Sequence, residues 1–209
     1  MTSEVSPTVY VVCEDRPQQA VMRKILLSRG IIPGRTYGCN GYGFIKTNIR
    51  RYNQPTVKMP FFALTDLDDR NICPGRLVEE WLGVPTPRPD LVFRVAVREI
   101  ESWLMADSDH FQEYFGIPYG NIPKNVDDEI SDPKIHLFDI IGRTSRKGDI
   151  KREVLPRGKA RIGPLYNDHM EKYVYNYWDI DAARQRSRSL SRTVERIDDL
   201  KDLLLQQSN

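Results

Sequence analysis

Acidic side chains follow three short apolar runs of the sequence, and their spacing suits the binding of a metal ion. They are Glu14 after TVYVVC, Asp66 and Asp68 after MPFFALT, and Glu99 and Glu101 after LVFRVAV. Carboxylates at close range do not all stay ionised unless a cation compensates their charge. A hard divalent ion such as Mg²⁺, or Mn²⁺ in its place, prefers carboxylate and water oxygens. One or two such ions could hold a phosphate and activate water for phosphodiester cleavage.

Each of these acids also has a plain structural interpretation. A single acid after a strand is often a helix N-cap or a turn residue, and Asp15 and Asp69 fit that role. Asp66 and Asp68 differ because, in an extended chain, their side chains point to the same side. Together with Glu14, this spacing favours a metal site over three unrelated caps.

Basic residues gather in the second half of the chain, although the formal net charge is only +2. Between residues 143 and 161, eight Lys and Arg residues stand against two acids, which favours a polyanionic partner. By charge alone, the candidates for phosphate binding are Lys151, Arg152, Lys159 and Arg161. Lys159 could also stabilise the transition state. The alternative for residues 143–161 is a solvated surface without a partner. Arg98, outside this stretch, is either a phosphate clamp or a structural ion-pair partner.

Strands that alternate with helices in the first half of the chain predict an α/β fold. The runs that predict strands are 8–13, 59–65 and 91–97. Helical spacing follows each run, with Asp15 and Pro74 as start signals and Gly30 as a stop. Because the runs lack strict alternation, they favour a parallel sheet covered on both faces. The crevice at the carboxyl ends of such strands would bring the acids together.

A glycine-rich segment, GCNGYG at 38–43, precedes the short basic helix predicted for FIKTNIRRYN. Such a segment can cradle a phosphate on backbone N–H groups at a helix N-terminus. A plain turn is the favoured interpretation, because the segment matches neither the P-loop spacing nor a dinucleotide fingerprint.

After about residue 107 the pattern changes to helices and loops. We expect helices at 108–115, 134–142 and 165–176, and a last one from about residue 179. The basic stretch 143–161 is expected to be a loop, and 206–209 a disordered tail. The pattern therefore divides the chain into a first domain of residues 1–107 and a helical, basic C-terminal lobe of residues 108–209.

The order of the acids resembles that of the Toprim domain, which occurs in topoisomerases, primases, small RNA-maturing nucleases and the OLD-type nucleases of bacterial phage defence. This resemblance covers about residues 8–107. LVFRVAVREIESWLMAD, DPK at 132–134 and GPLYN at 163–167 look more narrowly like stand-alone Toprim-like proteins of the DUF4276 group. The resemblance implies that residues 1–107 form a Toprim-like catalytic domain with a parallel sheet flanked by helices, followed by the mostly helical lobe.

By this resemblance, Glu14 is a metal ligand or a general acid/base, and Asp66 and Asp68 bind metal. Glu101, with Glu99 as the second choice, would fill the further acidic position that OLD-type nucleases use for a second metal. Toprim chains often have Gly directly after the glutamate, where this chain has Asp-Arg. The family pattern therefore does not fix the shape of this loop.

These features lead us to expect a nuclease that depends on Mg²⁺ or Mn²⁺ and cuts DNA or RNA. OLD-type nucleases carry an ATPase, but no Gly-x-x-x-x-Gly-Lys-[Ser/Thr] motif occurs in the sequence. The resemblance therefore implies a separate ABC- or AAA-type ATPase as partner in a phage-defence system. A homodimer through the C-terminal helix is a further hypothesis.

Two other function classes remain open. The fold could be a non-catalytic module that binds a metal or a nucleotide within a larger complex. An Asp-x-Asp pair also binds the metal of nucleotide-sugar donors in transferases, but that function leaves Glu14 and Glu101 unexplained.

The composition indicates a cytoplasmic protein that does not bind membranes. Hydrophobic residues make up 40% of the chain and the mean hydropathy is −0.52, and no apolar run reaches the ~18 residues of a membrane span. The start MTSEVSPTVY lacks the pattern of a secretory signal. The three cysteines are odd in number and widely spaced, so we expect neither a disulfide framework nor a zinc site.

Overall fold

The computed structural model describes residues 6–39, 41–67 and 71–207. The chain divides into two compact units, one of Met1–Val95 with Arg192–Asn209 and the other of Ala96–Ser191. The domain boundary at residue 107 stays a prediction. The two compact units instead meet along the chain after Val95 and after Ser191. The end of the last helix therefore belongs to the same unit as the sheet.

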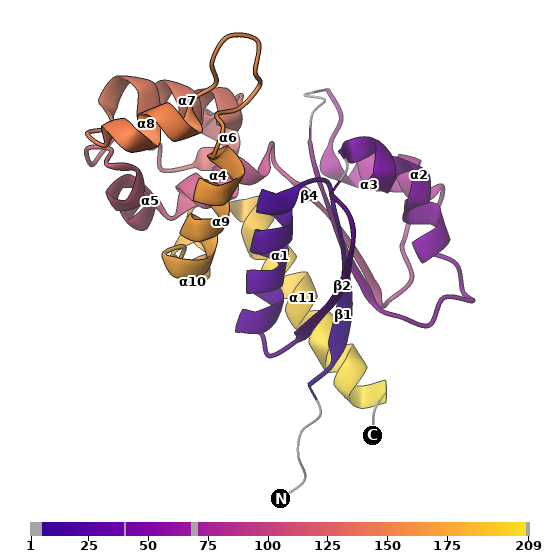
Figure 1. Ribbon diagram of the computed structural model, residues 1–209. Helices are drawn as coiled ribbons and strands as arrows, with labels where there is room; N and C mark the ends of the chain where they lie inside the picture. Colours follow the sequence, from indigo (N-terminus) through magenta and orange to yellow (C-terminus); the bar gives the residue numbers. More distant parts are fainter. Residues whose placement is uncertain (1–5, 40, 68–70, 208–209) are drawn as a thin grey trace, which may run out of the picture. The chain divides into compact units, whose positions relative to one another are not determined.

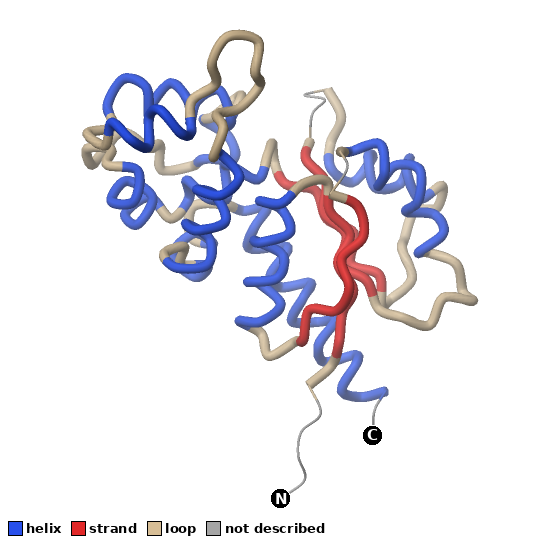
Figure 2. The backbone as a smooth tube through the Cα atoms, in the orientation of Figure 1, coloured by secondary structure: helices blue, strands red, loops and turns tan. Residues whose placement is uncertain are grey.

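Four parallel strands form the sheet of the first unit (Figure 2). They are β1 (Thr8–Cys13), β2 (Ile32–Gly38), β3 (Phe61–Asp66) and β4 (Leu91–Ala96), in the order β2-β1-β3-β4. The predicted α/β class with a parallel sheet is thus confirmed. Because β2 lies on one side of β1 and β3 on the other, the winding of the chain reverses between β1 and β3. In α/β sheets, ligands bind at the carboxyl ends of the strands at such a reversal.

β2 is the strand that the sequence did not predict. It contains Pro33 and Gly34, which are breaker signals inside a strand pattern. Proline is tolerated here because β2 is an edge strand and pairs only with β1. A Cβ at Gly34 would lie 3.1 Å from Thr8 Cγ2, so the two strands approach closely at this point.

Helices cover both faces of the sheet (Figure 1). α1 (Arg16–Ser28) and the C-terminal part of α11 (Arg188–Gln207) lie on one face, and α2 (Tyr42–Tyr52) and α3 (Pro74–Leu82) lie on the other. α1 begins where expected, because the Asp15 carboxylate accepts a hydrogen bond from the Gln18 N–H at 2.9 Å. The predicted disordered tail is wrong for residues 206 and 207, which are helical, while 208 and 209 lie outside the described residues.

The second unit is helical. Its helices are α4 (Ile100–Ala106), α5 (Ser108–Phe115), α6 (Val126–Glu129), α7 (Pro133–Thr144), α8 (Gly148–Val154), α9 (Tyr166–Asn176) and α10 (Ile180–Arg184). α4 is central, because it contacts α5, α6, α7 and α10, and its Trp103 is fully buried. The predicted helical C-terminal region is confirmed.

Two elements of this unit differ from the prediction. α8 lies inside the stretch expected to be a loop, and it buries Ile150 and Val154 one helical turn apart. The single helix expected from about residue 179 is divided into α10 and α11. The new start is stabilised by the buried Asp127, which accepts hydrogen bonds from the Ser187 hydroxyl and the Ser189 N–H, both at 2.8 Å. Among the described residues, no helix is both long and apolar enough to cross a membrane.

Candidate functional site

Glu14 and Asp66 lie at the carboxyl ends of neighbouring strands. Glu14 directly follows β1, Asp66 is the last residue of β3, and the two strands pair in parallel. The Thr65 hydroxyl donates a hydrogen bond to Glu14 Oε1, and the Glu14 N–H donates one to Gln18 Oε1 at 2.9 Å. The acids that the sequence placed after two separate strands therefore occupy the reversal point of the sheet.

The glycine-rich segment between β2 and α2 packs against the backbone of this site. The Cys39 N–H donates to Cys13 O at 2.9 Å, and the Gly41 N–H donates to Glu14 O at 3.0 Å. Gly38 has φ +98°, and a Cβ there would lie 2.2 Å from Cys13 O, so glycine is required. Gly41 is the N-cap of α2 and provides no side-chain cap. The Cys39 and Gly41 N–H groups thus bond to the backbone of Cys13 and Glu14, and the phosphate-binding role predicted for the glycine-rich segment stays a prediction.

The predicted metal-ligand set is only partly described. Asp68 and Asp69 lie outside the described residues. Within the ranges that the structure describes, no three His, Cys, Asp or Glu side chains are grouped so that they could hold a metal ion. Glu14 and Asp66 supply carboxylate oxygens, the donor type that Mg²⁺ and Mn²⁺ prefer, so the donor chemistry at the reversal point fits the predicted ion.

Glu99 and Glu101 belong to the second unit and share one basic partner. Lys134 Nζ lies 3.1 Å from Glu101 Oε1, and the Lys134 backbone N–H donates to Glu99 Oε2 at 2.7 Å. The Tyr166 hydroxyl also donates to Glu101 Oε1. Glu101 is only 1% exposed. Residues of α4, α7 and α9 thus meet at the buried Glu101 and at Glu99, the half-buried N-cap of α4.

The Glu99 carboxyl has a raised pKa because of its surroundings. Burial, together with the neighbouring Glu101 carboxylate, raises the pKa of Glu99 to about 7, although Lys134 opposes the shift. Glu101 Oε2 is buried and finds no hydrogen-bond partner in the described part of the chain. Lys134 and Tyr166 thus contact one oxygen of Glu101, while the other receives no hydrogen bond from the described residues.

An exposed loop joins α8 to α9 and carries Arg157, Lys159 and Arg161 (Figure 1). The loop is closed at its base, where the Gly163 N–H donates to Val154 O at 3.0 Å. A Cβ at Gly163 would lie 2.4 Å from Glu153 O, so the two backbones meet too closely for any larger residue. This base also positions Tyr166, three residues further on, against Glu101. We call residues 155–162 the basic loop.

The predicted phosphate-binding residues fall into different environments. Arg152, Lys159 and Arg161 are exposed and open to a polyanion. Lys151 instead donates to Gly142 O at 3.0 Å, near the C-terminus of α7, where a cation is favourable. Arg98 is half-buried, and its Nε has no hydrogen-bond partner among the described atoms; both roles considered for it stay predictions.

Sequence reasoning gave Lys134 no site role and considered Tyr166 only among the aromatic side chains that could stack on a nucleic acid, not as a partner of Glu101. Both lie in the short motifs that carried the family resemblance, DPK and GPLYN. Pro133 starts α7 and Asp132 caps it, so the DPK motif sets the position of Lys134. Comparisons with protein-family models, with curated proteins and with solved structures gave no match for this chain.

Proposed function

We propose that this chain is a metal-dependent nuclease that hydrolyses phosphodiester bonds of DNA or RNA, with Glu14, Asp66 and Asp68 as its principal carboxylates. The observation that carries the proposal is the position of Glu14 beside the end of β3, where the winding of a parallel sheet reverses. Ligand sites in open α/β sheets form at this position. The cytoplasm is the proposed compartment.

The proposed cofactor is Mg²⁺ or Mn²⁺. Glu14, Asp66 and Asp68 would hold it, and Glu99 and Glu101 are the proposed ligands of a further ion. When bound, the metal supplies Lewis acidity and an activated water. The buried Glu101 Oε2, which lacks a hydrogen bond from the described residues, supports the second assignment.

The chain's own basic groups would bind and orient the substrate. Arg152, Lys159 and Arg161 are exposed, as phosphate-binding side chains must be. Lys159, on the basic loop, is the proposed group that stabilises charge on the phosphate as the bond breaks. Lys151 and Arg98 complete the proposed set. Lys151 would have to exchange its hydrogen bond to Gly142 O for one to a phosphate.

The partners are proposed from the sequence. A separate ABC- or AAA-type ATPase would restrain or trigger the nuclease in a phage-defence system, because this chain has no Gly-x-x-x-x-Gly-Lys-[Ser/Thr] motif. A homodimer is a further proposal.

A second candidate function is a binding module without catalysis. It is favoured by one observation, namely that Glu101 already has Lys134 and Tyr166 as partners and so does not require a metal for charge balance. Such a module would bind a metal or a metal-bound nucleotide at Glu14 and Asp66.

The test incubates purified protein with plasmid, single-stranded DNA and total tRNA, each with Mg²⁺, Mn²⁺ or EDTA. Glu14→Gln removes one charge at the reversal point, and Glu79→Gln on the exposed face of α3 is the matched control. Cleavage that needs metal and is lost only in Glu14→Gln supports the nuclease. Thermal protection by metal without any cleavage supports the binding module. Cleavage that survives EDTA or the Glu14→Gln change contradicts both.

A further inference from the structure

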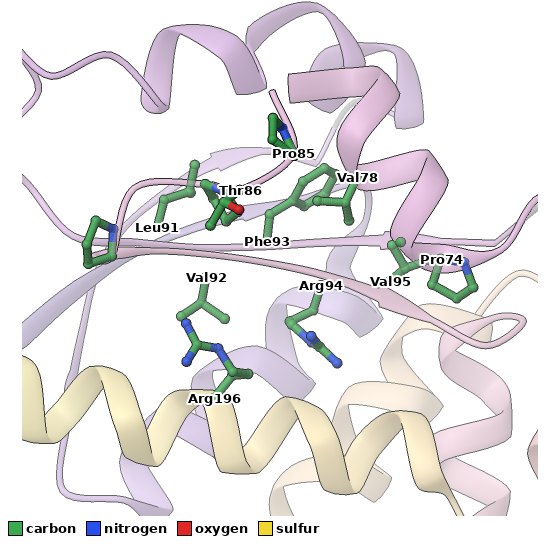
Figure 3. A pocket seen from close by; sticks show the side chains of 13 residues that line it. Pro74, Val78, Pro85, Thr86, Leu91, Val92, Phe93, Arg94, Val95 and Arg196 are labelled. Atoms are coloured by element: carbon green, nitrogen blue, oxygen red, sulfur yellow. The ribbon is translucent and has the colours of Figure 1, made fainter. Parts of the chain in front are cut away.

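A cavity of about 550 Å³ lies along β4, and none of its lining residues is an acid of the proposed nuclease site (Figure 3). All of its lining residues belong to the first compact unit. Its walls are mostly apolar, with Val78 from α3, Pro85 from the segment before β4, and Phe93 from β4 itself. Two cations, Arg94 and Arg196, also line it. β4 is the last strand in the sheet order, so the cavity lies at a sheet edge.

The alternation of side chains along β4 separates the apolar wall from the charges. Phe93 points towards α3, whereas Val92 and Arg94 point towards α11, from which Arg196 approaches (Figure 3). The cavity touches residues of both faces of β4 and therefore passes around its outer edge. A ligand in it could contact an apolar surface and two guanidinium groups at the same time.

Arg94 is a half-buried cation that forms no ion pair within the part of the chain that the structure describes. Its Nε donates to Thr193 Oγ1 at 3.3 Å, and no carboxylate among the described residues forms an ion pair with it. Burial lowers its pKa, and repulsion from Arg196 and Arg192 lowers it further, against a smaller opposing effect of Glu195. Arg196 does have a partner, Asp199, but that pair is exposed. A desolvated cation is normally paired with an anion, so an anionic group bound beside Arg94 would be stabilised there.

We propose that this cavity binds a small molecule that carries one anionic group on an apolar body. The anionic group lies between Arg94 and Arg196, and the body lies against Val78 and Phe93. The volume falls within the range of about 300–1,000 Å³ that is usual for small-molecule sites, and apolar walls with a few convergent polar groups are typical of them. The inference uses no residue of the proposed nuclease site and stands without it.

The experiment compares three probes with the same apolar chain, namely octanoate, octyl phosphate and octanol. Calorimetric titration of the full chain gives their affinities, and NMR of the backbone amide groups locates them. The expected result is that an anionic probe binds at least about tenfold more tightly than octanol, because charge-assisted hydrogen bonds to Arg94 form only with the anion. The amide signals of β4 and α3 should shift most. Comparing octanoate with octyl phosphate shows which anion the site prefers.

Arg94→Met keeps the length of the side chain and removes its charge, so binding of the anion should weaken about tenfold. Arg51→Met, on α2 and outside the cavity, is the control and should leave the affinity unchanged. If Arg94→Met does not fold, Arg196→Met gives the same test at an exposed position. Equal affinity for octanol and for the anions, no binding of either anion, or shifts away from β4 would each overturn the proposal.

Discussion

The Thr65 hydroxyl donates a hydrogen bond to the Glu14 carboxylate and thereby links the ends of β3 and β1. Thr65 is 1% exposed and directly precedes Asp66. A bond at this point fixes the side chain of Glu14 relative to the strand that carries the second acid. We therefore treat Thr65 as a positioning residue for the proposed nuclease site.

Thr65→Val keeps the shape of this side chain but removes the donor. We expect the free energy of unfolding to fall by about 1–2 kcal/mol, because a partly buried acceptor loses its hydrogen bond. We also expect metal-dependent cleavage to fall while Thr65→Ser retains it. Urea unfolding in EDTA and cleavage assays measure the two effects. Thr47→Val, at an exposed site on α2, is the control and should stay within about 0.5 kcal/mol of wild type. Normal cleavage by Thr65→Val would show that Glu14 is held by other contacts.

Lys134 provides the charge that balances a fully buried carboxylate. Lys134→Met should lower the free energy of unfolding by about 3 kcal/mol, because Glu101 would keep a buried charge without its cation. Adding Glu101→Gln should restore most of that loss. Arg143→Met breaks an exposed ion pair with Asp139 in the same helix and should cost less than about 1 kcal/mol. Equal effects of the two single changes in urea unfolding would argue against a buried pair.

Much of the fold follows from local sequence signals. β1 and α1 were predictable because an apolar run, the Asp15 cap and the Gly30 stop lie next to one another in the chain. β2 was not, since Pro33 and Gly34 take strand conformation only through their pairing with β1. α8 was not predicted because its charged residues outnumber the two apolar residues that it buries, so the sequence shows no apolar helical pattern there.

The candidate site likewise has a part that the sequence predicts and a part that it does not. A general rule for parallel sheets placed Glu14 and Asp66 at one edge, and this required no knowledge of side-chain contacts. The contact of Tyr166 with Glu101 joins residues 65 positions apart, and it depends on how α4 and α9 pack. No spacing in the sequence reveals such a pair.

Glu99 should make the stability of the protein depend on pH. Its pKa in the folded protein is raised to about 7, so between about pH 4.5 and 7 the folded state holds a proton that the unfolded state has released. The free energy of unfolding should therefore fall as pH rises through this window and receive no further contribution above it. Glu99→Gln should remove this part of the slope. Urea unfolding from pH 4.5 to 8 in EDTA measures it, and Glu79→Gln should keep the wild-type slope. A constant difference between Glu99→Gln and wild type at every pH would contradict the shifted pKa.

Gly163 closes the basic loop at its base, where a side chain has no room. Gly163→Ala should destabilise the protein by about 2 kcal/mol or more, because its Cβ would lie 2.4 Å from backbone atoms of Glu153 and Val154. The loop should also become easier to cut by trypsin at Arg157, Lys159 and Arg161. Gly142→Ala in α7 is the control, and its free energy of unfolding should rise instead of fall. The added Cβ meets only Leu155 Cδ1, at 3.6 Å. Alanine in a helix should therefore stabilise the protein by up to about 1 kcal/mol. Loss of stability in both variants, or unchanged trypsin cleavage in Gly163→Ala, would show that the close approach at Gly163 does not hold the loop.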